Sequence, residues 1–282
     1  MGFSKTIQMF IFDGNPNGRI MCEISNWNGR VYKVSRNELL EFSKRSDSDN
    51  TGVYFLFGKN DNNEDTVYIG EAEKIMTRLK QHLNEKVYWN DFIVVISKDN
   101  LLNKAHVKYL ENQFYSLAKN ANKTVIANSS IPNCPSISEF DEAMLLEFIS
   151  NTKLLVNALG YKTFDTIEDN KINTQNSESE FYIKTTRGAD AKGIIVSDGF
   201  AVLEGSMIAT STVASMSASL IRIRTSLLEK GIINAEFKFT RDYSFTSPST
   251  AAAIVMGRNA NGKTEWKTSD NKPLKEIEEN QI

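Results

Sequence analysis

The clearest pattern in the chain is a pair of short apolar segments separated by a polar turn. The segments are residues 52–58 and residues 66–70, and each contains β-branched and aromatic side chains, one Tyr and at least one Gly. Residues 59–65 between them include several Asn and Asp side chains, which favour turns. The pattern therefore predicts a β-hairpin. Because cross-strand neighbours lie about 5 Å apart, Tyr54 and Tyr68 can come close together.

The region before the hairpin, residues 1–49, predicts a β-meander followed by a short helix. Residues 6–34 alternate strand-like apolar segments with turn signals, of which Asn28-Gly29 is a strong signal for a two-residue hairpin turn. Ser35 and Glu38 have the spacing of a capping box, in which the two side chains satisfy each other's backbone N–H groups. We expect this region to pack on the domain that follows it.

Downstream of the hairpin, helix and strand patterns alternate and place polar residues at their edges. Arg78 and His82 are four residues apart, so they lie on one side of a predicted helix. Glu111 lies at the edge of the apolar stripe of a long helix, and Asn128 ends a short strand. The predicted elements are helix 73–83, a buried central strand 92–96, helix 103–120, strand 123–128 and helix 138–159.

A polar linker separates this region from a second domain. Residues 166–180 are rich in Asn, Ser, Glu and Asp and contain no aromatic side chain, so they cannot bury enough apolar surface to fold. Residues 181–268 predict a small α+β domain, and residues 269–282 a tail that frays from Asn271. The second domain is expected to contain strands 181–184, 193–196 and 200–204, a hairpin turn at Ser197-Asp198-Gly199, helix 213–230, a helix from Ser247-Pro248 to Gly257, and a turn at Asn261-Gly262.

Composition and charge narrow the class of protein. The apolar share of 40% and the charged share of 24% are ordinary for globular chains, which argues against global disorder. The net charge of −2 gives no global signal for nucleic-acid binding. Cys22 and Cys134 are far apart and in no metal-ligand spacing, so we expect free thiols in a reducing compartment. No apolar run approaches the roughly 20 residues that span a bilayer, and no signal-peptide pattern is present, so we expect a soluble cytoplasmic protein.

The order of several residues resembles the GIY-YIG nuclease superfamily. The matching residues are Gly52-Val53-Tyr54, Tyr68-Ile69-Gly70, Arg78, Glu111 and Asn128, in this order. The resemblance covers about residues 50–165. It implies a small α+β domain with a central antiparallel sheet flanked by helices. It also implies hydrolysis of nucleic-acid phosphodiesters with one divalent metal ion, Mg²⁺ or Mn²⁺.

The resemblance implies a role for each of these residues, and the chemistry of the side chains agrees. Glu111 would hold the metal ion, because one carboxylate with waters and phosphate oxygens is a typical magnesium arrangement. Arg78 would bind the phosphate through its planar, permanently charged guanidinium. The general base is assigned to the pair Tyr54 and Tyr68, with Tyr68 slightly favoured. His82 would relay a proton or hold the phosphate.

Two further residues near the predicted site allow alternatives. Asn128 would orient a tyrosine or the nearby backbone, but an Asn at a strand end is often only a turn former. Glu71 departs from the family pattern, in which a cationic or amide residue often follows the second tripeptide. Its negative charge lies beside a site meant for phosphate, so it either pairs with Arg78 or Lys74 or weakens substrate binding.

The positive excess of the chain lies in the second domain. Residues 181–267 carry 11 Lys and Arg against 7 Asp and Glu. Their sequence resembles an uncharacterised domain that commonly follows GIY-YIG nucleases in bacteria. A basic surface that includes an aromatic side chain is typical of nucleic-acid binding. The candidates for such a surface are Arg222, Arg224, Arg241, Arg258 and Trp266.

These observations predict a metal-dependent endonuclease with DNA as the favoured substrate, with restriction or phage defence as a candidate setting. One alternative is a catalytically inactive nucleic-acid-binding protein, which predicts salt-dependent binding without metal-dependent cleavage. The other is a scaffold whose second domain recruits a protein partner. No membrane partner is expected. The oligomeric state stays open, with a homodimer as one option.

Overall fold

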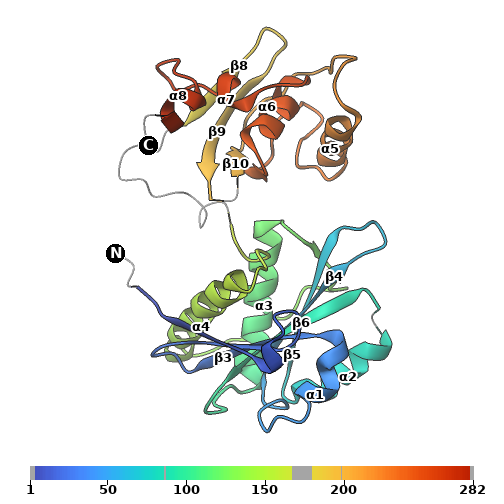
Figure 1. Ribbon diagram of the computed structural model, residues 1–282, viewed down its shortest axis with the longest axis vertical. Coiled ribbons are helices and arrows are strands. Elements are labelled where there is room, and N and C mark those ends of the chain that lie inside the picture. Colours follow the sequence, from blue (N-terminus) through green and yellow to red (C-terminus); the bar gives the residue numbers. More distant parts are fainter. Residues whose placement is uncertain (1–3, 86, 167–179, 198, 280–282) are drawn as a thin grey trace. The chain divides into compact units, whose positions relative to one another are not determined.

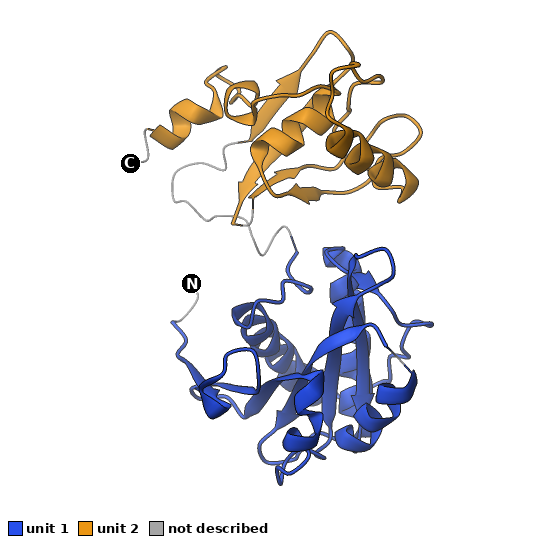
Figure 2. Ribbon diagram, turned by 45° about the vertical axis from the view of Figure 1, so that its right-hand side comes forward, with its two compact units in different colours: residues 1–166 blue, residues 167–282 orange. Residues whose placement is uncertain are grey.

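The computed structural model describes residues 4–85, 87–166, 180–197 and 199–279 (Figure 1). The chain divides into two compact units, residues 1–166 and residues 167–282 (Figure 2). Both units combine helices with a sheet, which confirms the predicted α+β class. Most of the predicted linker and the turn residue Asp198 lie outside the described residues.

The first unit is built on a seven-stranded sheet whose order is β1-β2-β3-β6-β4-β5-β7. Neighbouring strands are antiparallel, as predicted, except for β5 and β7. That pair is parallel, which differs from the predicted antiparallel sheet. β6 lies in the middle, and residues 92–96 are buried, as the apolar run predicted. The strands are β1 (Ile7–Ile11), β2 (Ile20–Ile24), β3 (Gly29–Ser35), β4 (Gly52–Lys59), β5 (Asp65–Ala72), β6 (Trp89–Ser97) and β7 (Val125–Ile126).

Helices cover both faces of this sheet, so the central strands are buried on both sides (Figure 1). Because successive side chains of a strand point to opposite faces, Phe55 of β4 joins the core beneath α3 and α4, and Tyr54 joins the core beneath α1 and α2. The helices are α1 (Leu39–Phe42), α2 (Ile75–Glu85), α3 (Lys104–Ala121) and α4 (Glu139–Ala158).

The capping box predicted at Ser35 and Glu38 does not form. A 3-10 turn (Arg36–Glu38) leads into α1, and the side chain of Ser35 makes no capping hydrogen bond. The carboxylate of Glu38 instead lies 3.4 Å from Nε of Arg19. The ion pair across the meander therefore replaces the local cap.

The second unit contains a four-stranded antiparallel sheet with the order β11-β10-β9-β8 and the apolar helix α6. Ser247 caps α6, Pro248 begins it, and Gly257 ends it in a left-handed conformation with a φ of 66°, all as predicted. The elements are β8 (Phe181–Lys184), β9 (Asp190–Val196), β10 (Gly199–Val202), α5 (Ala218–Glu229), β11 (Tyr243–Phe245), α6 (Pro248–Met256), α7 (Gly262–Glu265) and α8 (Leu274–Glu279).

Two predictions about segments of this unit, the start of a helix and the frayed tail, were wrong. The helix expected from residue 213 begins at Ala218, because Asn259 hydrogen-bonds the backbone of Ser215 and Ser217 and holds that segment outside the helix. The expected fraying from Asn271 is replaced by α8 over most of the tail that the structure describes. Leu274 of α8 is fully buried, and its N–H donates to the carbonyl of Trp266 at 2.9 Å. Apolar burial therefore orders a segment whose composition is mostly polar.

None of the helices in the described part of the chain has both the length and the apolar character that a membrane crossing requires. Both cysteines are free thiols, as predicted; Cys22 is buried and Cys134 is exposed.

Candidate active site

A cavity of about 610 Å³ in the first unit gathers four of the six predicted catalytic residues. Tyr54 comes from β4, Tyr68 from β5, Arg78 from α2 and Glu111 from α3. Segments that are distant in sequence therefore meet here because the sheet places β5 beside β4 and the two helices lie on either side. The full lining is Tyr54, Tyr68, Glu71, Ala72, Glu73, Lys74, Arg78, Lys104 and Glu111.

The strand register brings the two tyrosines to the same face of the hairpin. Tyr54 pairs with Gly70, and Tyr68 pairs with Leu56, so the phenols are diagonal neighbours with ring centroids 6.2 Å apart. Gly70 makes this arrangement possible, because a Cβ atom there would lie 2.4 Å from the phenolic oxygen of Tyr54. The predicted hairpin and the predicted proximity of the two rings are both confirmed.

The two phenols have different surroundings. Tyr54 is 1% exposed, and this burial, with smaller contributions from Tyr68 and Glu111, raises its pKa well above the usual value of 10. Tyr68 is only partly buried and lines the cavity. A phenol whose ionised form is disfavoured is a poor general base. The geometry therefore favours Tyr68 over Tyr54 for that role.

His82 lies behind the tyrosines and is absent from the cavity lining. Its side chain is fully buried, and Nε2 lies 2.8 Å from the phenolic oxygen of Tyr54. Nδ1 lies 3.5 Å from the carboxylate of Glu85, one helical turn later. The prediction that His82 holds a phosphate is wrong in this arrangement, because the imidazole has no solvent-facing surface. The alternative role, proton relay through Tyr54, is compatible with the geometry.

Arg78 lies at the wall of the cavity between α2 and the hairpin. Its Nη1 donates to Oε1 of Gln81 at 2.7 Å. Partial burial alone would lower the pKa of Arg78, but the nearby Tyr54 and Tyr68 raise it overall. The side chain is therefore a fixed cation beside both phenols.

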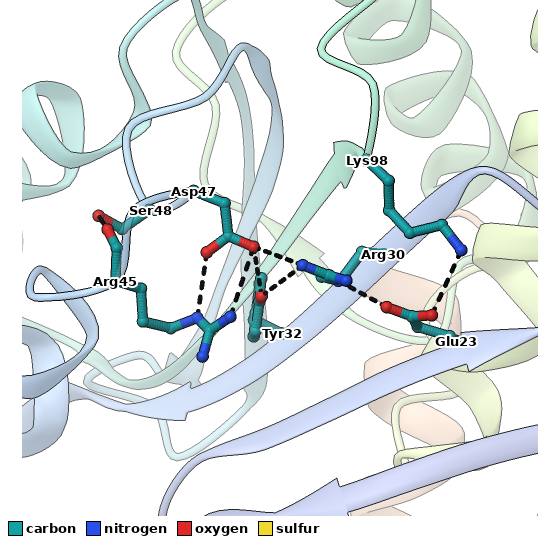
Figure 3. A network of polar contacts seen from close by, with 7 residues as sticks. All are labelled: Glu23, Arg30, Tyr32, Arg45, Asp47, Ser48 and Lys98. Carbon is teal, nitrogen blue, oxygen red and sulfur yellow. Dashed lines mark hydrogen bonds and ion pairs between the residues drawn. The ribbon is translucent and has the colours of Figure 1, made fainter.

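The loop before β4 holds the start of the helix that carries Arg78. Oδ1 of Asp49 accepts a hydrogen bond from the backbone N–H of Met76 at 3.0 Å, in the first turn of α2. Two residues earlier, Asp47 anchors the same loop to β3 (Figure 3). Its carboxylate lies 2.7 Å from Arg30 and accepts a hydrogen bond from Tyr32 at 2.6 Å.

Glu111 projects from α3 into a cavity that contains other acidic groups. Burial raises the pKa of Glu111 to about 7, and the nearby carboxylate of Glu71 adds to this effect. Glu71 itself pairs with Lys104 at 2.9 Å. The predicted partners of Glu71, Arg78 and Lys74, were therefore wrong, because α3 brings Lys104 closer to its carboxylate.

Lys104 is a cationic lining residue that sequence reasoning missed. It is the first residue of α3 and precedes Glu111 by seven positions. Because seven residues make almost two helical turns, the two side chains share one face of the helix. This spacing was the signal available in the sequence, and it belongs to no motif.

Asn128 acts on the backbone next to Tyr68. Its Oδ1 accepts from the N–H of Ile69 at 3.0 Å, and its Nδ2 donates to the carbonyl of Ile69 at 2.7 Å. The side chain thus continues the ladder between β5 and β7, which itself ends at Ile126. Of the two predicted readings, orientation of the nearby backbone agrees with these contacts.

The predicted basic surface of the second unit is only partly exposed. Arg224 is 4% exposed, and its guanidinium donates to the carbonyls of Ile254 and Ala209. Trp266 is fully buried and donates to the carbonyl of Pro248. These two residues were wrongly assigned, because core packing and backbone carbonyls account for their polar atoms.

The other three arginines differ in exposure. Arg222 is exposed on α5, and Arg241 is half-buried. Arg258 pairs with Glu265 at 2.7 Å. Arg222 is therefore the candidate that the structure leaves most accessible among these residues.

Comparison with known proteins assigns part of the chain. Residues 181–278 match the family model described as a domain of unknown function, DUF4357. No curated protein matches the chain, and no solved structure does. The match falls on the predicted second domain. The resemblance of residues 50–165 to GIY-YIG nucleases stays a prediction.

Proposed function

We propose that the protein is a metal-dependent endonuclease that hydrolyses phosphodiester bonds, with DNA as the favoured substrate. The observation that supports this most is the convergence of Tyr54, Tyr68, Arg78 and Glu111 in one cavity. Phosphodiester hydrolysis needs an activated water, a cation that stabilises the developing negative charge, and a carboxylate that can hold a metal ion. This set of side chains offers all three.

The side chains divide the work according to their surroundings. Arg78 binds and orients the phosphate, because it is a fixed cation at the cavity wall. Tyr68 orients the attacking water, since its phenol is the more accessible of the two, and as the phenolate it would accept that water's proton. Tyr54 holds its neighbours in place and would give its own proton to His82, whose Nε2 lies 2.8 Å from its oxygen, only as it takes up another.

The residues present fit a divalent cation held by one protein carboxylate. Among the described residues, no group of three or more His, Cys, Asp and Glu side chains forms a metal site of its own. Glu111 is a partly buried carboxylate in a cavity with room for waters and phosphate oxygens, which Mg²⁺ commonly retains as ligands. When bound, Mg²⁺ or Mn²⁺ would polarise a phosphate oxygen and neutralise charge in the transition state.

The test is cleavage of supercoiled plasmid by the full chain with Mg²⁺ or Mn²⁺, followed on agarose gels. Glu111→Gln and Arg78→Ala should each lower the rate by at least about a hundredfold. Matched controls are Glu147→Gln and Lys119→Ala, which change exposed residues of α4 and α3. Full activity of Glu111→Gln would contradict the metal assignment, and the circular dichroism spectrum of each variant checks its fold.

A non-catalytic nucleic-acid-binding protein is the second candidate, and Glu71 favours it. Its carboxylate places negative charge beside the proposed phosphate position. This candidate predicts salt-sensitive binding to duplex, single-stranded or branched nucleic acid with no metal-dependent cleavage of any of them.

The second unit is proposed to bind nucleic acid or recruit a protein. Arg222 is the exposed cation on which nucleic-acid binding would depend. Arg222→Ala should then weaken DNA binding and leave the cleavage chemistry of the first unit intact. An unchanged affinity would favour recruitment of a protein partner. A cytoplasmic restriction or phage-defence role, and assembly as a homodimer, remain proposals of the same kind.

A further inference from the structure

One ion pair inside the cavity joins α3 to the end of β5. Nζ of Lys104 lies 2.9 Å from Oε1 of Glu71 and donates to Oε2 at 3.0 Å. Glu73 adds a second carboxylate 3.8 Å away. The side chain of Glu71 is 12% exposed and that of Lys104 is 44% exposed. The ammonium is therefore held by both oxygens of a mostly buried carboxylate, while the lysine side chain as a whole is partly exposed.

The cavity lining holds equal numbers of basic and acidic side chains. The cations are Lys74, Arg78 and Lys104, and the carboxylates are Glu71, Glu73 and Glu111. A phosphodiester adds negative charge to this set, and a cation that turns from its carboxylate toward the phosphate would offset that charge.

Lys104 is the lining cation best suited to change its partner. Arg78 already donates to Gln81 and lies beside both tyrosines in the cavity lining. A lysine ammonium is a point charge with three donors on a flexible four-carbon stem, so it can turn from one anion to another without moving the backbone.

The backbone at Lys104 is fixed by the cap of its helix. Oδ1 of Asn103 accepts from the backbone N–H of His106 at 3.0 Å, and the side chain of His106 reaches back to the N–H of Asn103. Glu111 follows two turns later on the same face. A fixed helix start therefore holds the ammonium on the same side of α3 as the proposed metal ligand.

We propose that Lys104 contacts a non-bridging phosphate oxygen of the substrate strand, and that Glu71 is the internal counter-ion which Lys104 exchanges for that oxygen. This inference rests on the proposed function and adds two residues to it. Glu71 then acts as a built-in competitor of the substrate phosphate and sets the affinity of the site. Its position after the second tripeptide keeps the ammonium beside the cavity.

The experiment measures binding of fluorescently labelled duplex DNA to the full chain by anisotropy, in EDTA so that metal-dependent cleavage is suppressed. Lys104→Met should lower the affinity about ten- to a hundredfold, the usual effect of one hydrogen bond to a charged group. It should also lower the slope of log affinity against log salt by about one. Glu71→Gln should raise the affinity. Lys104→Arg should keep most of the affinity that Lys104→Met loses.

Lys119→Met, at an exposed position near the end of α3, is the matched control and should bind as the unaltered chain does. If the ion pair were merely structural, Glu71→Gln would lower the affinity for DNA instead of raising it. Glu71→Gln and Lys104→Met would break the same link, so both would weaken binding and lower the melting temperature. That result, or unchanged affinity of Lys104→Met, overturns the inference.

The outcome also separates this inference from the proposed function. If Lys104→Met and Glu71→Gln bind and cleave DNA as well as the unaltered chain does, the proposed exchange of Glu71 for phosphate by Lys104 is refuted. The nuclease proposal then stands. If the unaltered chain neither binds nor cleaves any nucleic acid, both are refuted.

Discussion

The close approach of Tyr54 to Gly70 gives a quantitative test of the cavity geometry. A methyl group at position 70 would lie 2.4 Å from Cζ and Oη of Tyr54 and 2.9 Å from Cε2, so Gly70→Ala must displace the ring. Overfilling a packed core costs about 1–3 kcal/mol, and we expect about 2 kcal/mol here. For the first unit, which spans 166 residues, this corresponds to a melting temperature about 4–8 °C lower.

A double-mutant cycle identifies the ring as the cause. Tyr54→Leu removes Cε2, Cζ and Oη, so Gly70→Ala should cost close to nothing in that background. Gly52→Ala is the matched control, because its Cβ would lie 2.2 Å from the backbone carbonyl of Val95. No change at Tyr54 can relieve that contact, so the cost of Gly52→Ala should be the same in both backgrounds.

The assay is urea unfolding of each variant followed by circular dichroism, with plasmid cleavage measured in parallel. Displacing Tyr54 should also lower cleavage, since the ring lines the cavity. The reasoning would be refuted if Gly70→Ala left the free energy of unfolding unchanged, or if its cost persisted in full beside Tyr54→Leu.

Asn128→Ala should lower the free energy of unfolding of the first unit by about 1–3 kcal/mol, because it leaves the N–H and the carbonyl of Ile69 unpaired; a urea midpoint equal to that of the unaltered chain would contradict this. Burial alone would raise the pKa of Asp47, but its hydrogen bonds and ion pairs outweigh burial and lower this pKa below 3.8. The ionised carboxylate therefore contributes fully to stability at neutral pH, and this contribution is lost as the pH falls through the lowered pKa. Asp47→Asn should therefore destabilise at neutral pH, and the difference in urea midpoint should shrink in acid; a constant difference would argue against this linkage. Arg224→Met should destabilise the second unit by about 2 kcal/mol, because two buried carbonyls lose a charged donor. Weakened DNA binding with unchanged thermal stability would instead support the original assignment of Arg224 to a nucleic-acid-binding surface.

Local patterns in the sequence were enough to predict most elements of the fold and the core of the site. The hairpin followed from apolar and aromatic residues around a polar turn, and its register then brought Tyr54 and Tyr68 together. The helices of Arg78 and Glu111 followed from apolar periodicity. In each case the information lies within a few neighbouring residues.

The features that sequence reasoning missed depend on contacts between distant segments. The pair of Glu71 with Lys104 joins residues 33 positions apart. The bonds of Asn128 to Ile69 span 59 positions, and the sequence predicted only that Asn128 orients a tyrosine or nearby backbone, without naming Ile69. Arg224 stands on a helix whose charge suggests a surface, and only the packing of α5 against α6 explains its burial. No local pattern distinguishes such residues from solvent-exposed ones.

The position of β3 in the sheet determines where the first unit can be cut. β3 pairs with the central strand β6 over seven residue pairs, from Gly29↔Ser97 to Ser35↔Asp91. A fragment that began near residue 50, where the tripeptide motif starts, would leave one side of β6 unpaired along its apolar run. An open edge of this kind invites association with other chains. A fragment of the first unit should therefore retain β3, and this strand before the motif is part of the scaffold that holds the tyrosines.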